Sequence, residues 1–235
     1  MKWGMSGKTE LPSESIGRRF AWFAAWAAVV VGGFAYVSSV LCDRVNPFHS
    51  GNGSSADLVV IVLLSPLLFF LGPRQNWRPA EVSAVSVLRW NGLCFVLPFF
   101  LALHWESVGG ILGVRFSLKS ADLGSLDARA AVVAAVALPA VVGLVVCHLV
   151  WAKRRGILGR YLGALLGIPC GLAIATVLLG DGYYLHVHHY CVGAFLFPFF
   201  CFRRVISLVA QGFFLGLAVE GVSRWEADPL WYALG

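Results

Sequence analysis

Long apolar runs dominate this chain and limit what it can fold into. Several of them approach the ~20 residues that a helix needs to cross the hydrocarbon core of a bilayer. Of the 235 residues, 59% are hydrophobic and 13% are charged, whereas roughly 25% are charged in a typical soluble domain. Little polar sequence remains for a separate soluble domain. The sequence therefore predicts an all-α fold, a polytopic transmembrane helix bundle.

Seven apolar segments are predicted to form spans. They cover residues 20–42, 57–72, 82–104, 129–151, 160–179, 183–202 and 205–225. The second is short for a span. The sixth reaches spanning length only if its histidines enter the helix, which Pro198 would then kink.

Basic residues lie in short groups beside the apolar runs. With seven spans, one side of the membrane receives Arg18, Arg19, Arg74, Arg78, residues 153–160, Arg203 and Arg204. Lys and Arg concentrate in cytoplasmic loops, so we expect the N-terminus inside and the C-terminus outside. The chain then divides into a basic cytoplasmic-side tail (1–19), a transmembrane helical domain (20–225) and a short outer-side tail (226–235).

The net charge of +6 follows from this topological placement. A nucleic-acid partner is not expected, because the sequence lacks an extended basic face with interleaved aromatic residues. The predicted partner of the apolar spans is the lipid bilayer; the sequence does not indicate which membrane.

Glycines repeat every four residues in two of the predicted spans. They are Gly163, Gly167 and Gly171 in the fifth, and Gly212 and Gly216 in the last. Residues at this spacing share one helix face, and small residues let helix backbones approach closely. The favoured interpretation is packing inside this protein. The alternative is a contact with another membrane protein.

Three of the six histidines stand within four positions, at His186, His188 and His189. If a helix starts near Tyr183, His186 shares a face with His189 and Tyr190, because residues three and four apart are neighbours on a helix. His188 would then point elsewhere. The predicted topology also places His49 and His104 in the outer half, and only His148 in the inner half.

Imidazole is a common ligand for transition metals and titrates near neutral pH. The candidate metal ligands are His186, His189, His188 and His104, with zinc, iron or copper as the ion. A haem held by His104 and either His186 or His189 is a further alternative. The competing interpretation is an interfacial belt, in which tyrosines anchor at the headgroups and the histidines only hydrogen-bond. A proton relay or a ligand contact is the remaining possibility.

Few polar side chains fall inside the predicted spans. A carboxylate there costs roughly 2.5–3.5 kcal/mol on insertion scales, so Glu220 is expected to pair with Arg224 one helical turn away. Gln211 is expected to hydrogen-bond between helices. This scarcity disfavours a solute carrier or receptor. The sequence also lacks a serine-hydrolase elbow, a phosphate-binding loop and a dinucleotide fingerprint.

The six cysteines are dispersed, without a Cys-x-x-Cys pair. Cys42 and Cys191 are the two that the predicted topology places near the same membrane face. A disulfide between them is one alternative, and two small buried thiols are the other. The redox compartment is not decided by this pattern.

The last quarter carries an ordered set of motifs: His186-Val-His-His-Tyr190, Phe195-Leu-Phe-Pro198, Gln211-Gly212, Leu215-Gly216, Gly221, Arg224-Trp225 and Asp228-Pro-Leu230. This order resembles the membrane region of fungal LCCL-domain proteins over about residues 181–230. The chain departs from that pattern in lacking room for the LCCL module and in carrying Glu220. The resemblance implies a membrane domain without an established chemistry.

These features predict a structural or assembly subunit of the membrane whose outer-face histidine cluster binds a metal. The alternative function, from another class, is a metal- or haem-dependent membrane oxidoreductase. No catalytic residue is assigned by either interpretation.

Overall fold

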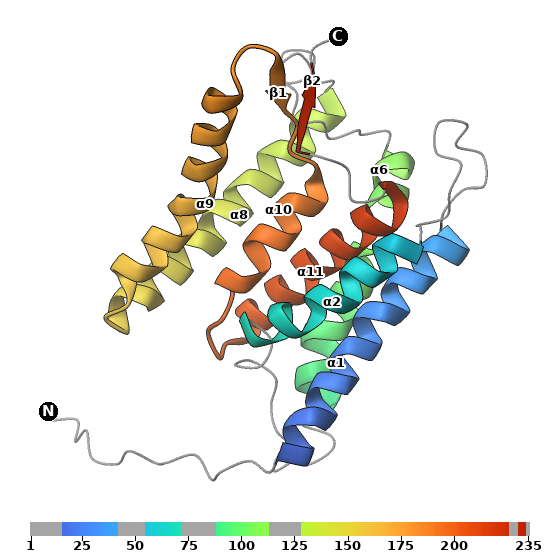
Figure 1. Cartoon of the computed structure of the whole chain (residues 1–235). Helices are drawn as coiled ribbons and strands as arrows, with labels where there is room; N and C mark the ends of the chain where they lie inside the picture. The colour runs from blue at the N-terminus through green and yellow to red at the C-terminus, as the bar shows by residue number, and fades with distance from the viewer. Residues whose placement is uncertain (1–15, 42–54, 72–87, 113–127, 226–229, 234–235) are drawn as a thin grey trace, which may run out of the picture.

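The computed structural model describes residues 16–41, 55–71, 88–112, 128–225 and 230–233. Its elements are α1 (Ile16–Tyr36), η1 (Val37–Leu41), α2 (Ser55–Leu71), η2 (Leu88–Val96), α5 (Leu97–Ala102), α6 (Trp105–Leu112), α8 (Ala128–Arg154), α9 (Leu158–Leu179), β1 (Tyr183–Leu185), α10 (His189–Leu196), η3 (Phe197–Phe199), α11 (Val205–Trp225) and β2 (Trp231–Ala233). Apart from the β1–β2 pair, these elements are helical, so the predicted all-α class is confirmed (Figure 1).

Four helices in the described residues are long and apolar enough to cross a membrane. They are Phe20–Leu41, Ala131–Arg154, Leu158–Leu179 and Val205–Arg224. A fifth span results if Trp90–Ala102 and Trp105–Ile111, which meet at a bend of 60°, are counted together. The protein is therefore an integral, multi-pass membrane protein. The prediction of seven spans goes beyond these four or five, and the inside and outside assignment stays a prediction.

Helix α11 is the centre of the bundle. It packs against α10, α5, η2 and α1, and 72% of its apolar spanning stretch is buried. Phe95, Phe99 and Leu215 are among the fully or almost fully buried side chains where α11 meets η2 and α5. Close van der Waals packing of side chains around α11 is what holds these helices together.

Glycines allow the neighbours of α11 to approach its backbone. A Cβ added at Gly212 would lie under 3.0 Å from the carbonyl oxygen of Phe95, and one at Gly216 equally close to that of Phe99. On α10, which also packs against α11, a Cβ added at Gly193 would clash with the backbone of Phe214. Internal packing is thus the role of Gly212 and Gly216, as small residues permit in membrane helices.

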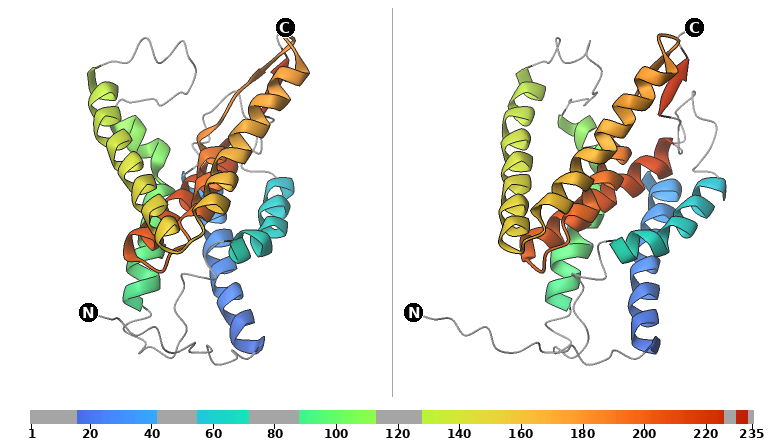
Figure 2. Two further views of the ribbon diagram at one scale, coloured as in Figure 1. Left: turned by 90° about the vertical axis from the view of Figure 1, so that its left-hand side faces the viewer. Right: turned by 60° about the vertical axis from the view of Figure 1, so that its left-hand side comes forward.

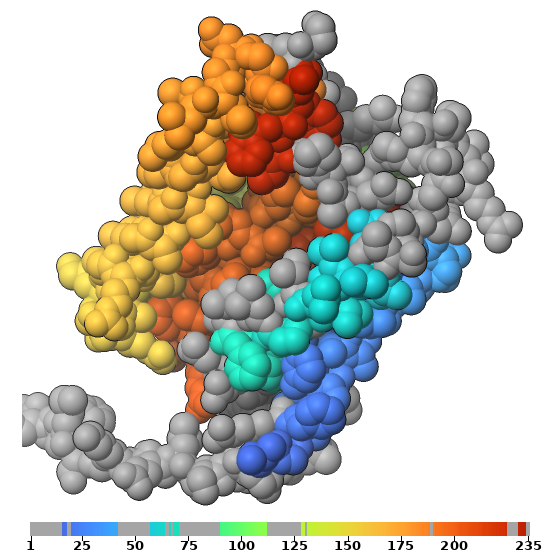
Figure 3. Space-filling view, in the orientation of Figure 1, coloured from blue at the N-terminus to red at the C-terminus, as the bar shows by residue number. Residues whose placement is uncertain are grey.

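Helices α8 and α9 form a hairpin that is splayed away from this centre (Figure 2). Of the apolar spanning stretch of each helix, only 6% is buried in α8 and 0% in α9. Helix α9 forms one edge of the molecule (Figure 3). Apart from the backbone of α9 itself, no heavy atom of the described residues lies within 4 Å of a Cβ added at Gly163, Gly167 or Gly171. The expectation that this glycine face packs against another helix of the same chain is therefore wrong for the helices that the structure describes.

The predicted sixth span, 183–202, is not one helix. Residues Tyr183–Leu185 form β1, which pairs antiparallel with β2 in the register Tyr183↔Ala233 and Leu185↔Trp231. Helix α10 begins only at His189, and Pro198 lies in the short η3 turn that follows it. The strand satisfies its backbone groups through β2, so it needs no helix to do so.

The predicted third span is broken near its end. The helical run through η2 and α5 stops at Leu103–His104, and α6 continues in residues 105–112 at the 60° bend. A loop was expected there. The amphipathic composition of α6, which begins with Trp105 and Glu106, is compatible with a short helix at the end of a span.

Candidate functional site

The histidine segment contributes to a cluster of stacked rings at the end of the molecule where β1 and β2 lie (Figure 1). We call this cluster, made of Tyr184, His186, His188, Tyr190 and Tyr232, the ring cluster. Residues 184, 186 and 188 come from β1 and the extended segment after it, while Tyr190 lies in the first turn of α10 and Tyr232 belongs to β2. Strand pairing is what brings Tyr232 to the histidines.

Contacts within the ring cluster are close. The ring centroids of His186 and His188 are 4.2 Å apart, and His188 stacks on Tyr190 with centroids at 5.3 Å and an interplanar angle of 14°. The hydroxyl of Tyr232 lies 3.3 Å from Nε2 of His188. Both histidines are half-buried, so the pair remains reachable from the surface.

The helical-face prediction for the histidines is wrong. His186 precedes the helix in extended backbone, and His188 is the N-cap of α10 with φ −71° and ψ 154°. Side chains two residues apart share a face in extended backbone, so His186 pairs with His188 rather than with His189. His189 is the first residue of α10, and its side chain lies outside the part that the structure describes.

The described residues give no support to the predicted metal site, which stays a prediction. Among the described residues, no group of three His, Cys, Asp or Glu side chains is arranged to hold a metal ion. His186 and His188 are the two imidazoles that come together. A two-imidazole site with further positions open to water or to another ligand is what this pair could form.

His104 lies in a different set of contacts. Its Nε2 is 3.4 Å from the hydroxyl of Tyr36, and the two rings have centroids 5.7 Å apart. This contact joins α1 to the break between α5 and α6. His104 is therefore a helix-packing residue here, and its pairing with His186 or His189 across a haem receives no support. His49 lies outside the described residues.

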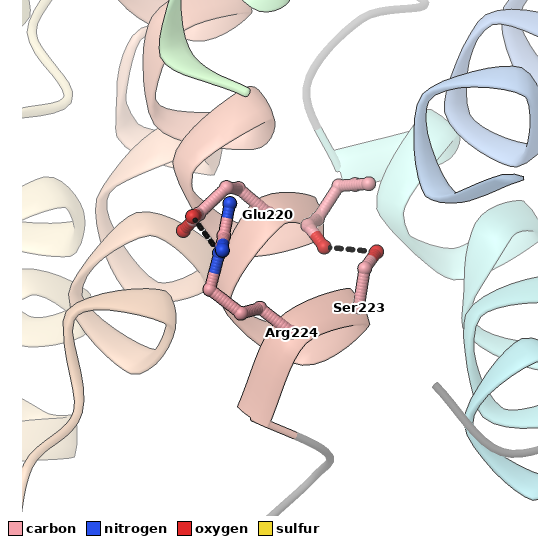
Figure 4. A network of polar contacts seen from close by, with 4 residues as sticks. Glu220, Ser223 and Arg224 are labelled. Carbon is pink, nitrogen blue, oxygen red and sulfur yellow. Dashed lines mark hydrogen bonds and ion pairs between the residues drawn. The ribbon is translucent and has the colours of Figure 1, made fainter. Parts of the chain in front are cut away.

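The expected ion pair in α11 is present. Nε of Arg224 donates to Oε1 of Glu220 at 2.9 Å, and Glu220 is fully buried while Arg224 is 11% exposed. The hydroxyl of Ser223 donates to the carbonyl oxygen of Val219 at 2.6 Å (Figure 4). Both contacts are formed within one helix. The ion pair therefore compensates the buried charge of Glu220 within α11 and does not line a path through the protein.

A second buried polar contact joins α8 to α11. His148 is fully buried, its Nδ1 lies 2.7 Å from the carbonyl oxygen of Leu144, and its Nε2 lies 2.8 Å from the hydroxyl of Ser207. A carbonyl can only accept, so Nδ1 carries a hydrogen, and Nε2 shares a second hydrogen bond with the hydroxyl of Ser207. His148 is thus a doubly hydrogen-bonded helix-packing residue.

Sequence reasoning missed the aromatic partners of the histidines. Tyr184, His186, His188 and Tyr190 repeat every two residues, which is the period of an extended strand. That signal was present beside the helical one. Tyr232 carried no comparable signal, since its partner strand lies beyond α10 and α11 in the chain. Trp231, whose Nε1 donates to Thr176 of α9 at 2.9 Å, was missed for the same reason.

Of the two alternatives for Cys42 and Cys191, the structure gives Cys191 as a free, half-buried thiol. Cys42 lies outside the described residues.

The chain matches no protein-family model, and neither curated proteins nor solved structures show a significant similarity to it. The resemblance of residues 181–230 to the membrane region of fungal LCCL-domain proteins therefore stays a prediction from the residues themselves.

Proposed function

We propose that this protein is an assembly subunit of a membrane complex, and that its α8–α9 hairpin is the surface that receives a helix of a partner protein. The observation that carries the proposal is the exposed glycine face of α9. Helices in lipid gain little from hydrophobicity alone when they associate, so their interfaces are rich in small residues that permit close approach. Gly163, Gly167 and Gly171 form such a face, and no other helix of the described part of the chain lies against it.

The same molecule shows what glycines at this spacing do when a partner is present. Gly212 and Gly216 lie directly against the backbone of η2 and α5, and Gly193 lies against α11. A third helix with the same spacing and no neighbour supports a partner that is supplied from outside the chain. A helix face that contacts only lipid would make more van der Waals contacts with larger side chains than with glycines.

The buried polar groups support a structural role over transport. His148 bonds to Ser207 and Leu144, and Glu220 pairs with Arg224 of its own helix. Intramembrane polar groups usually mark a substrate path when they face a cavity. Here the contacts are short and close within or between packed helices, so their contribution is to helix packing.

The assembly proposal predicts a change in mass without a change in stability. Gly167→Leu is expected to remove the partner from the protein extracted with its native lipid, because the leucine side chain fills the glycine face that the partner helix would contact. The melting temperature of the isolated chain is expected to stay unchanged. The mass of the extracted particle, measured with and without the substitution, reports the result. Ala173→Leu, at another exposed position of α9 that lies away from the glycine face, is the matched control.

A particle of single-chain mass before substitution would overturn this proposal. So would a mass that responds equally to Gly167→Leu and Ala173→Leu, since that result would place lipid against the glycine face.

We further propose that His186 and His188 bind a divalent transition metal at the outer end of this subunit. Two imidazole nitrogens that share one ion lie roughly 3 Å apart, given metal–nitrogen distances of about 2.0–2.1 Å. Ring centroids at 4.2 Å are compatible with that separation. The hydroxyl of Tyr232 beside Nε2 of His188 could fix the ring so that Nδ1 faces the ion, as outer-shell partners of metal-bound histidines do.

Metal binding is tested with Zn²⁺ and Cu²⁺ on the detergent-purified chain. His186→Ala and His188→Ala are each expected to lower affinity by at least about tenfold, because a single imidazole loses the chelate, and binding should weaken as acidification protonates the rings. His104→Ala, in the contact with Tyr36, should bind as the unaltered protein does. Equal affinity in all three variants would leave only the interfacial-belt interpretation of these histidines.

A further inference from the structure

Three basic chain segments meet at the end of the molecule opposite β1 and β2 (Figure 1). Helix α8 ends there with Lys153 and Arg154, α9 begins at Leu158, and α11 begins at Val205 just after Arg203 and Arg204. The hydroxyl of Tyr161 in α9 donates to the carbonyl oxygen of Phe199 at 2.9 Å. This contact holds the α8–α9 turn against the segment that leads into α11.

Two arginines at this end are held over aromatic rings. The guanidinium carbon of Arg155 lies 5.0 Å from the ring centroid of Phe202, and that of Arg204 lies 5.7 Å from the ring of Trp151. The two rings are themselves in contact, with centroids 5.9 Å apart. A cation is attracted to the face of an aromatic ring, so these contacts restrict where the two guanidinium groups lie.

Both arginines nevertheless remain available to a ligand. Their side chains are exposed, and within the part of the chain that the structure describes neither makes an ion pair. A contact with a ring does not use up the N–H donors of the planar guanidinium. Planar N–H pairs at an edge are suited to phosphate oxygens.

The surroundings add positive potential without negative charge. The described carboxylates lie elsewhere: Asp57 and Glu106 open α2 and α6, Asp181 follows the far end of α9, and Glu220 is near the far end of α11. Burial raises the pKa of the Cys201 thiol above its ordinary value, so this neighbour is neutral near pH 7. The N-terminus of α9 lies at this end of the molecule, and Ile157 makes no side-chain cap bond to its first-turn amides, which carry the positive end of the helix dipole.

The position of this basic cluster relative to the apolar spans indicates which ligand it binds. The apolar spans of α8, α9 and α11 all end here, so Arg155 and Arg204 lie where the hydrocarbon core gives way to headgroups. We infer that Arg155 and Arg204, with the amide end of α9, bind the phosphate of an anionic lipid headgroup. Basic sites between membrane helices on the cytoplasmic side recognise such headgroups in this way. This inference goes beyond the proposed assembly role and does not depend on the α8–α9 face having a partner.

The test uses the full chain in detergent with phosphatidic acid or phosphatidylcholine added. Native mass spectrometry should show more bound phosphatidic acid than phosphatidylcholine, and Arg155→Gln and Arg204→Gln should each reduce that binding about fivefold, as one surface cation contributes. Arg129→Gln removes an exposed arginine from the other end of α8 and should leave binding unchanged. A thermal melt of each variant separates lost binding from lost folding.

Two further arms decide what is being bound. Lysine at both positions keeps the charge but loses the planar donor edge, so Arg155→Lys/Arg204→Lys should still bind less than the unaltered chain. Millimolar inorganic phosphate should not displace the lipid. Displacement by phosphate would assign the site to a free anion, and equal binding by the lysine double variant or by the two glutamine variants would overturn a built headgroup site.

Discussion

Gly216→Leu is expected to prevent the bundle from forming. Any side chain at this position would lie under 3.0 Å from the carbonyl oxygen of Phe99, and its Cβ would be 2.9 Å from Cβ of Ala102. Backbone cannot yield as a flexible side chain can, so α11 and α5 would have to separate. Overpacking a core costs typically 1–3 kcal/mol even when neighbours can shift, and about 3 kcal/mol or more is expected here. Monodisperse yield and the melting temperature in detergent measure the loss.

The matched control is Gly167→Leu in the isolated chain. The two changes are chemically identical and both occur in apolar spanning helices, but Gly167 has no heavy atom within 4 Å of an added Cβ. It should therefore melt as the unaltered chain does. If the two variants lost stability equally, the packing of α11 against η2 and α5 would not be the contact that limits the fold.

The second large effect is expected at the buried ion pair. Arg224→Met leaves the carboxylate of Glu220, fully buried on α11, without the guanidinium that lies 2.9 Å from it. Removing one partner of a buried pair typically costs about 3–5 kcal/mol because a charge is then left uncompensated. The free energy of unfolding, measured by denaturant titration in detergent, should fall by this amount.

The double variant Glu220→Gln/Arg224→Met distinguishes the ion pair from simple helix packing. It removes both charges, so it should be more stable than Arg224→Met alone, since replacing a whole buried pair is often nearly neutral. If the stability losses of Glu220→Gln alone and Arg224→Met alone added up to the loss of the double variant, the two side chains would contribute independently of their contact.

The long helices were predictable because length and hydropathy are enough to define them. Predicted spans 20–42, 129–151, 160–179 and 205–225 correspond to α1 with η1, α8, α9 and α11 within a few residues at either end. Boundary differences of this size are common to all helix assignments. The bend at His104 was not predictable, because Leu103 and His104 contain neither the proline nor the glycine that usually marks a kink.

The candidate site was predictable in composition but not in geometry. The rule that a span needs about 20 residues favoured a helix through His186 and His189. That rule applies to a segment exposed to lipid, whereas non-helical backbone is tolerated where the protein covers it. The partner that covers β1 is a distant strand, and no local pattern announces a pairing of that range.

The glycine motifs show a similar limit. Spacing alone places Gly163, Gly167 and Gly171 on one face just as it does Gly212 and Gly216. Whether a neighbour lies against that face depends on how the helices are arranged, and one set is packed tightly while the other is exposed. The same local sequence pattern therefore fits both a finished contact and a surface still to be covered.

The pairing of β1 with β2 has a consequence for biogenesis. A ribosome delivers β1 before α10 and α11, and the strand that completes it follows only after both helices have been made. Until then the edge of β1 has no strand beside it, and Tyr232, which contacts His186 and His188, is not yet part of the molecule. The connection between α9 and α10 therefore cannot take its final paired form until the end of the chain has been made. A chain whose synthesis stops before Trp231 would carry the long apolar helices that the structure describes but would lack the strand that pairs with β1.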